Sequence, residues 1–226
     1  LRALNYYEAN NSLDKKQIYL NQSLESIYKD ILTNINLPES ILIGQPWFWS
    51  LNKDSIKVHF ELIDYIYFSQ ICLSVIEMIA AKNILVLGDG SGVNCALINA
   101  NSKTNINLTH VDLGQYLLMQ YIVNYEWRNN SRYFFAENFP NPSINKIDML
   151  INMDSFPEMT ESEVKKYVRF IKDNKVKYLL SYNHKIIDDR QTNFRKYLYG
   201  CGMKLIISYS SIVRPGWYIE LFKAEE

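Results

Sequence analysis

Two kinds of hydrophobic pattern alternate along this chain from residue 83 onward. Short apolar runs are typical of buried strands, and the segments between them carry apolar residues at helical spacing. We expect strands at 83–87, 106–111, 132–136, 147–152 and 176–182, and two closing strands at 203–210 and 216–223. We expect helices at 93–99, 114–127, 161–173 and 190–199.

The order of these elements predicts an α/β fold. Strands that alternate with helices form a parallel sheet with right-handed crossovers. The two closing strands flank the short turn Arg214-Pro215-Gly216, so they form an antiparallel terminal hairpin of a mostly parallel, seven-stranded sheet. Upstream, 11–33 and 61–78 have the pattern of helices. We therefore expect an N-terminal helical cap over 1–80, which covers the acceptor site, and a Rossmann-like domain over 81–226, together one compact unit.

A glycine-rich turn follows the first strand of this domain. The sequence ILVLGDGSG at 84–92 places Gly88, Gly90 and Gly92 between a buried strand and a helix. This geometry lets the backbone approach a nucleotide while the helix N-terminus faces it. The spacing G-x-G-x-G misses the dinucleotide fingerprint G-x-G-x-x-G by one residue, and no Gly-Lys-Ser/Thr follows, which excludes a phosphate-binding P-loop.

The second strand ends in Asp112. An acid at this position can accept hydrogen bonds from both hydroxyls of a ribose. Alternatively, Asp112 caps the helix that follows. With the glycine turn it predicts a nucleoside site, and the G-x-G-x-G spacing favours S-adenosylmethionine over NAD. The expected cofactor-binding residues are Gly88, Asp89, Gly90, Ser91, Gly92, Asp112, Leu113, Glu137 and Asn152.

Composition narrows the class of partner. The 226 residues carry 24 basic and 24 acidic side chains, so the chain lacks the positive charge of a nucleic-acid binder. Its apolar runs are shorter than a bilayer span, which predicts no membrane span. Cys72, Cys95 and Cys201 lie in apolar patterns, as reduced core thiols of a cytoplasmic protein do. We find no metal-ligand cluster in the sequence and expect no metal site.

The fourth strand leads into the most specific motif. Residues 152–159 read N-M-D-S-F-P-E-M, and the fifth strand ends in Tyr182-Asn183-His184. With the glycine turn and Val111-Asp112-Leu113, this stretch resembles the bacterial sugar O-methyltransferase family, over roughly residues 55 to 190. The resemblance implies a class I methyltransferase fold with S-adenosylmethionine as cofactor. It also implies methylation of a sugar hydroxyl in a bacterial surface polysaccharide or its precursor, so the partner is a small-molecule or glycan acceptor.

Methyl transfer from a sulfonium requires a positioned acceptor and a base for its hydroxyl proton. Asp154, Glu158 and His184 follow strands four and five, whose ends overhang the ligand crevice of open α/β sheets. We expect them to be the catalytic residues. The alternatives are that Asp154 only forms a turn, that Glu158 caps a helix or pairs with Lys165 or Lys166, and that His184 lies in an exposed loop.

Two other functions fit part of the pattern. A nucleotide-binding oxidoreductase of the NAD type would use the same strand, turn and helix, although Val93 stands where a third spaced glycine is expected. The second is a catalytically silent subunit with the methyltransferase fold. Methyltransferases place an acid two residues before the first glycine, and this chain has Val86 at that position. Trp47 and Trp49 would stack on a sugar or simply fill a core.

Overall fold

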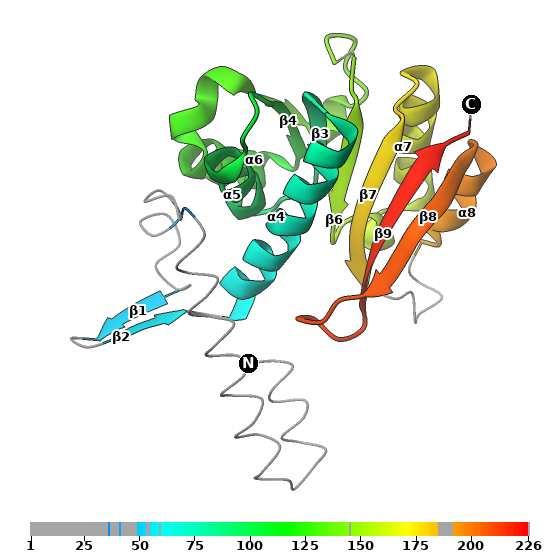
Figure 1. Ribbon diagram of the computed structural model, residues 1–226. Helices are drawn as coiled ribbons and strands as arrows, with labels where there is room; N and C mark the ends of the chain where they lie inside the picture. Colours follow the sequence, from blue (N-terminus) through cyan, green and yellow to red (C-terminus); the bar gives the residue numbers. More distant parts are fainter. Residues whose placement is uncertain are drawn as a thin grey trace, which may run out of the picture.

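The computed structural model describes residues 36, 41, 49–52, 55–58, 60–144, 146–184 and 192–225 (Figure 1). The side chains of 49–52, 55–58, 60 and 61 are outside this description, as are the helix expected at 11–33 and the aromatic residue Trp47.

Seven strands form one sheet in the order β5-β4-β3-β6-β7-β9-β8. The first five, β3 (Asn83–Leu87), β4 (Asn107–Asp112), β5 (Ser131–Phe135), β6 (Met149–Met153) and β7 (Tyr178–His184), pair in parallel. The closing strands β8 (Met203–Ser210) and β9 (Trp217–Ala224) pair antiparallel, and β9 inserts antiparallel beside β7. The predicted mostly parallel, seven-stranded sheet with an antiparallel terminal hairpin is confirmed.

Helices cover both faces of the sheet (Figure 1). One face packs against α4 (Phe60–Ile79), α5 (Val93–Asn101) and α6 (Gly114–Val123), and the other against α7 (Glu161–Asp173) and α8 (Phe194–Gly200). Short 3₁₀ helices lie at η2 (Tyr125–Asn130), η3 (Ala136–Asn138) and η4 (Phe156–Glu158).

Strand β3 shows why this sandwich forms. Its apolar residues alternate between the two faces: Ile84 and Val86 join the core under α4, whereas Leu85 and Leu87 join the core under α7 and α8. Because each face is buried, the strand reads as a continuous apolar run, as expected of a central parallel strand. Helix α7 instead begins at a capping box in which Thr160 and Glu163 hold each other's backbone N–H groups.

Helix α4 is part of the same core and not a separate layer. Phe68, Cys72 and Ile76 pack against the sheet, and Leu62 and Ile66 pack against α5. Residues Leu62–Ile79 are long and apolar enough to cross a membrane by length and composition, which the sequence pattern did not indicate. Their apolar character is accounted for by this packing, since 44% of the segment is buried in the protein.

Several element boundaries differ from the prediction. The helix expected over 114–127 ends at Val123 and continues as η2. The fifth strand runs to His184, so that residue belongs to β7 and does not follow it. An antiparallel pair that we did not predict, β1 (Trp49–Asn52) and β2 (Ser55–Val58), precedes α4.

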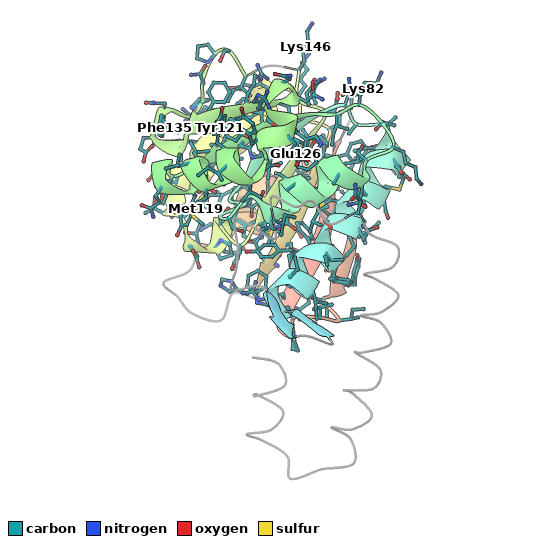
Figure 2. All side chains as sticks on the ribbon, turned by 90° about the vertical axis from the view of Figure 1, so that its left-hand side faces the viewer. Lys82, Met119, Tyr121, Glu126, Phe135 and Lys146 are labelled. Atoms are coloured by element: carbon teal, nitrogen blue, oxygen red, sulfur yellow. The ribbon has the colours of Figure 1, made fainter. Side chains whose placement is uncertain are left out.

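Large apolar side chains are exposed along α6 and the edge strand β5. Tyr121 of α6 and Phe135 at the end of β5 lie on the face that Figure 2 turns toward the viewer. Leu118 and Ile122 of α6 are exposed as well. This edge of the sheet is therefore covered by a helix with an apolar outer surface.

Candidate active site

The glycine turn connects β3 to α5 and is held from three sides. The Gly90 amide donates to Asp112 Oδ2 over 3.1 Å, and Gln120 Nε2 donates to the Gly90 carbonyl over 3.2 Å. Asn124 Nδ2 donates to the carbonyl of Gly92 over 2.9 Å. Residues of β4 and α6 thus fix the turn at the carboxyl end of β3.

The three glycines serve different purposes. A Cβ at Gly88 would lie 2.6 Å from the Cβ of Ser155, and one at Gly92 would lie 2.7 Å from the Cα of Gln120, so packing alone requires both. Gly90 has a φ of +56° and no atom within 4 Å of the place that a Cβ would occupy. The space above Gly90 is open, which leaves a cradle for a ligand against bare backbone.

Asp112 connects the turn to the second strand. Its Oδ1 accepts from the amide of Leu113 over 2.8 Å, and its Oδ2 accepts from Gly90 and from Gln120 Nε2, the latter over 2.7 Å. Burial raises the pKa of this carboxyl, and its hydrogen bonds oppose that shift. Helix α6 begins after Leu113 without a side-chain cap, so Asp112 does not cap it. The carboxylate faces the turn, where a ribose would lie.

Asp154 and His184 meet at the carboxyl ends of β6 and β7, across the same edge of the sheet from Asp112. His184 Nδ1 lies 3.3 Å from Asp154 Oδ1, and the imidazole packs edge-on against Trp217 with ring centroids 5.5 Å apart. Asp154 has a φ of +46°, a left-handed conformation that Asp tolerates. Burial raises its pKa to about 6, although Arg214 and His184 act in the other direction. The group is thus ionised at neutral pH but more basic than an exposed carboxylate.

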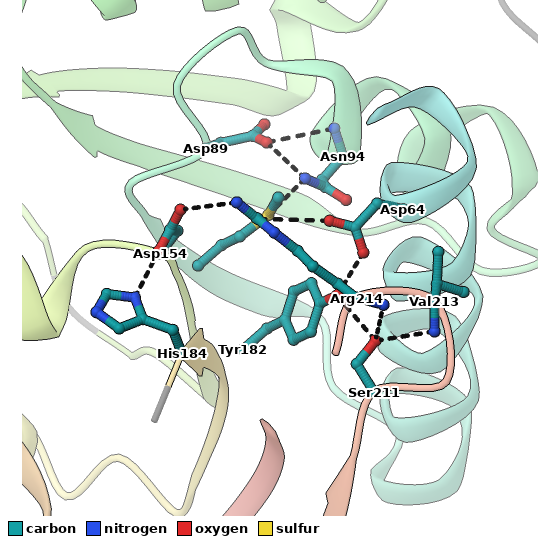
Figure 3. Close-up of polar contacts among 10 residues, drawn as sticks. Asp64, Asp89, Asn94, Asp154, Tyr182, His184, Ser211, Val213 and Arg214 are labelled. Carbon is teal, nitrogen blue, oxygen red and sulfur yellow. Dashed lines mark hydrogen bonds and ion pairs between the residues drawn. The ribbon is translucent and has the colours of Figure 1, made fainter. Parts of the chain in front are cut away.

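Arg214 connects Asp154 to helix α4. Its Nη2 lies 3.7 Å from Asp154 Oδ2, and its Nη1 lies 3.5 Å from Asp64 Oδ2 on α4 (Figure 3). The guanidinium covers the ring of Trp217, 3.3 Å from the centroid. The buried Tyr182 hydroxyl donates to Asp64 Oδ1. Two carboxylates and an aromatic face therefore hold Arg214 in one position.

One cavity of about 1510 Å³ is lined by the glycine turn and Asp112 on one side and by Asp154 and Arg214 on the other. Its volume exceeds the roughly 300–1,000 Å³ of a typical small-molecule site, so it accommodates a cofactor together with an acceptor. The charged residues of its wall are seven acids and two bases: Asp64, Asp89, Asp112, Glu137, Asp154, Glu158, Glu163, Lys166 and Arg214.

Most predicted site residues line this cavity. They are Gly88, Asp89, Gly90, Ser91, Asp112, Leu113, Glu137, Asp154 and Glu158. Three others do not. Gly92 packs against α6, and His184 contacts Asp154, which lines the cavity. Asn152 was expected to face the cofactor, but its fully buried side chain binds Ser155 and Asn183 behind the cavity wall. Ser155 of the loop after β6 and Asn183 of β7 thus occupy the two ends of the Asn152 amide.

The geometry argues against two alternatives for Glu158, the helix cap and the pair with Lys165. Thr160 and Glu163 cap α7, and Lys165 pairs with Glu161 over 2.6 Å. Glu158 is exposed at the cavity wall instead.

Sequence reasoning missed Asp64 and Arg214. Asp64 stands near the start of a long apolar helix, and a buried acid in such a run is a signal of a polar role. For Arg214 the only signal in the sequence was its position in a predicted turn. Its approach to Asp64 joins residues 150 positions apart, a distance that no local pattern reports.

A second group of ligand-type side chains lies behind the glycine turn. Asp89, Cys95 and His110 place a carboxylate oxygen, a thiol sulfur and an imidazole nitrogen within 4.8 Å of one another, all buried. The sequence predicted no metal-ligand cluster, because these residues stand far apart in the pattern. The fold brings them together, since β4 and α5 both pack beside the turn.

The chain matches no protein-family model and no curated protein. Among solved structures it is similar to the S-adenosylmethionine-dependent methyltransferase SibL, with 14% identity and a TM-score of 0.55 over 70% of this chain. It is similar to the methyltransferase domain of bacterial CtHen1-C, with 12% identity and a TM-score of 0.57, again over 70% of this chain. The mitomycin 7-O-methyltransferase MmcR gives 11% identity and a TM-score of 0.53 over 71%.

The alignments cover 55% of SibL and 56% of MmcR, but 97% of the CtHen1-C domain. This chain therefore spans little more than half of two of these proteins. At such identities the similarity defines the fold, which is that of the class I methyltransferases.

Proposed function

We propose that this chain is an S-adenosylmethionine-dependent O-methyltransferase that methylates a hydroxyl group of a sugar. One observation carries the proposal: a single cavity has the open glycine turn and Asp112 on one side and Asp154 with Arg214 on the other. Class I methyltransferase structures share this fold, and ligands of open α/β sheets bind at the carboxyl ends of the strands.

The cofactor side fits a nucleoside. Gly90 leaves open space against its backbone, and Asp112 has used three of roughly four lone-pair positions, so it can accept from a ribose hydroxyl. Leu113 and Glu137 extend this wall. When bound, S-adenosylmethionine supplies an electrophilic methyl group on a sulfonium. The acidic wall suits its positive charge.

The acceptor side supplies a base and its support. Attack of a hydroxyl oxygen on the methyl group breaks the sulfur–methyl bond and leaves a proton to be removed from the oxygen. Asp154 lines the cavity, so we assign proton removal to its carboxylate. His184 lies behind Asp154 and orients it, and Arg214 holds the other oxygen. Glu158, exposed at the same wall, would contact the acceptor.

The sheet disfavours an NAD-type oxidoreductase. The doubly wound dinucleotide fold continues with a parallel sixth strand, whereas this sheet inserts the antiparallel β9 beside β7. A catalytically silent subunit is disfavoured because a candidate base, Asp154, lines the cavity and is supported by His184 and Arg214. Val86 itself is buried under α4, so an acid there would not be solvated.

The wall also bears on the acceptor class. Seven carboxylates against two cations repel phosphate, which speaks against nucleic acid and for an uncharged hydroxyl compound. The sugar assignment rests on the resemblance of residues 152–159 to the sugar O-methyltransferase family, and a cytoplasmic location accords with polysaccharide precursors.

A transfer assay tests the proposal. Protein, S-adenosylmethionine with a labelled methyl group and a panel of free monosaccharides and polysaccharide fragments are incubated, and labelled product is identified by mass spectrometry. We expect an O-methyl sugar. A labelled amine, thiol or RNA from parallel incubations, with no labelled sugar, would contradict the acceptor class.

A further inference from the structure

The buried group of Asp89, Cys95 and His110 lies behind the glycine turn, and the methyl transfer proposed above assigns no chemical step to it. Asp89 lies in the glycine turn, Cys95 in the first turn of α5 and His110 in β4. Their exposed fractions are 3%, 0% and 0%. Three potential ligand atoms within 4.8 Å of one another are therefore buried.

The neighbours of His110 fix its tautomer. Gln120 uses both N–H groups of its amide, toward the Gly90 carbonyl and toward Asp112 Oδ2. Its Oε1, 3.2 Å from His110 Nδ1, can only accept, so Nδ1 carries the proton. The lone pair of the ring is then on Nε2, which is buried without a hydrogen-bond partner in the part of the chain that the structure describes. Burial lowers the pKa of His110 to about 4, so the ring is neutral.

An imidazole with one nitrogen anchored and the other free is the arrangement of a metal-ligating histidine. Such residues donate their second N–H to a carbonyl or carboxylate, which sets the tautomer and the ring orientation. Here the anchor is the amide oxygen of Gln120, whose Nε2 donates to Asp112.

The charge of Asp89 is also uncompensated. Its oxygens accept from the amides of Asn94 and Cys95, from Asn94 Nδ2 and from the Cys95 thiol, all neutral donors (Figure 3 shows the two from Asn94). No lysine or arginine among the described residues forms an ion pair with it. A buried carboxylate without a counter-charge is costly, and a cation would offset that cost.

We propose that Asp89, Cys95 and His110 bind one soft divalent cation of the zinc type. Carboxylate, thiolate and imidazole are the three ligand types that zinc takes in proteins, and tetrahedral coordination places ligand atoms about 3.6 Å apart. Shifts on the order of 1 Å bring the three atoms to that spacing. Binding forms a metal–sulfur bond and releases the thiol proton of Cys95 to solvent. The ion ties the glycine turn to α5 and β4.

Cobalt(II) titration of the full chain without cofactor tests this site. We expect the chelator-treated protein to take up one Co²⁺ per chain, with the thiolate charge-transfer absorption of a cobalt–sulfur bond, and Zn²⁺ to displace it. Cys95→Ala should abolish that absorption while far-UV circular dichroism shows the fold intact. Cys201→Ala is the matched control, because Cys201 lies at the end of α8, and it should bind as wild type does.

Thermal unfolding gives a second measurement. Zn²⁺ should raise the Tm of wild type and of Cys201→Ala but not that of Cys95→Ala or His110→Gln, because only folded protein with intact ligands binds it. Absence of a cobalt–sulfur absorption in folded wild type would overturn the site, as would an unchanged spectrum in Cys95→Ala. Methyl transfer is not measured in either experiment, so their failure leaves the proposed function untouched.

Discussion

Asp154 is the residue on which the proposed methyl transfer depends most, because it is the proposed base. Its carboxylate lines the cavity, and His184 and Arg214 hold one oxygen each. The sequence pointed to Asp154 and His184 because both stand at strand ends. The sequence could not tell which of the two side chains faces the cavity. Only the structure shows that Asp154 faces the cavity while His184 lies behind it, since that depends on where the β6 and β7 ends lie relative to the β8–β9 turn.

Asp154→Asn should lower the turnover number by about 10²–10⁴-fold, the cost of losing a general base. The amide keeps the size of the side chain, and Asn also tolerates the left-handed backbone of this position. The Kd for S-adenosylmethionine should not change. Steady-state kinetics and calorimetry on the same preparation measure both. A variant that retains more than half of wild-type turnover would remove Asp154 from the mechanism.

The pH profile provides a separate test of the same group. A base with a pKa of about 6 loses activity as pH falls below about 6, and turnover should then fall tenfold per pH unit. The stability effect has the opposite sign. Because the folded pKa lies above the unfolded value of 3.8, this group contributes less stability as pH rises from 3.8 toward 6. Asp154→Asn should therefore not be less stable than wild type at pH 8, as measured by thermal unfolding.

Asp112→Ala should weaken S-adenosylmethionine binding by about 1–3 kcal/mol, the range for lost hydrogen bonds to a charged acceptor. The matched control is Asp148→Ala, because Asp148 also accepts from backbone amides, those of Lys82 and Asn83, but at the start of the strands. Both variants lose stability, whereas only the first should lose affinity. Equal Kd values for the two would show that Asp112 is purely structural.

At the scale of elements, the hydrophobic pattern predicted the sheet well. Strand β3 alternates between two buried faces, and every strand of the large sheet was expected within a few residues. The β1–β2 pair was not expected, because each strand has only 4 residues, too few for the alternation in WSLN and SIKV to stand out. Only part of the role of α4 could be predicted from the sequence. The sequence predicted a helix that covers the site, but the contact of Asp64 with Arg214 depends on how α4 lies against the β8–β9 turn.

Arg214→Ala should detach that turn from α4 and from Asp154. We expect the KM for the acceptor to rise by about tenfold or more while the Kd for S-adenosylmethionine stays unchanged, because the glycine turn does not contact Arg214. Arg195→Ala is the matched control: Arg195 also pairs with a buried carboxylate, that of Glu220, outside the cavity wall. An equal change of KM in both variants would indicate a general loss of stability and no acceptor role for the turn.

At the scale of the whole molecule, the account depends on a division of one cavity into two ends. The central strands β3 and β4 supply the cofactor end, and β6 with the loop after it and the β8–β9 turn supply the acceptor end. The parallel order of the sheet brings these ends to one edge, which sequence order alone could suggest. The acidic character of the wall could not be foreseen, because the chain as a whole carries no net charge.

Calorimetric titration with S-adenosylmethionine tests the central claim most directly. Wild type should bind one molecule per chain and should not bind NAD. Gly90→Val should stay folded but lose binding, because its side chain fills the open space above the turn. Gly202→Val is the matched control, since Gly202 also has a positive φ and open space around it but lies outside the cavity wall. It should bind as wild type does. Undiminished binding by folded Gly90→Val, or binding of NAD in place of S-adenosylmethionine by wild type, would contradict the account.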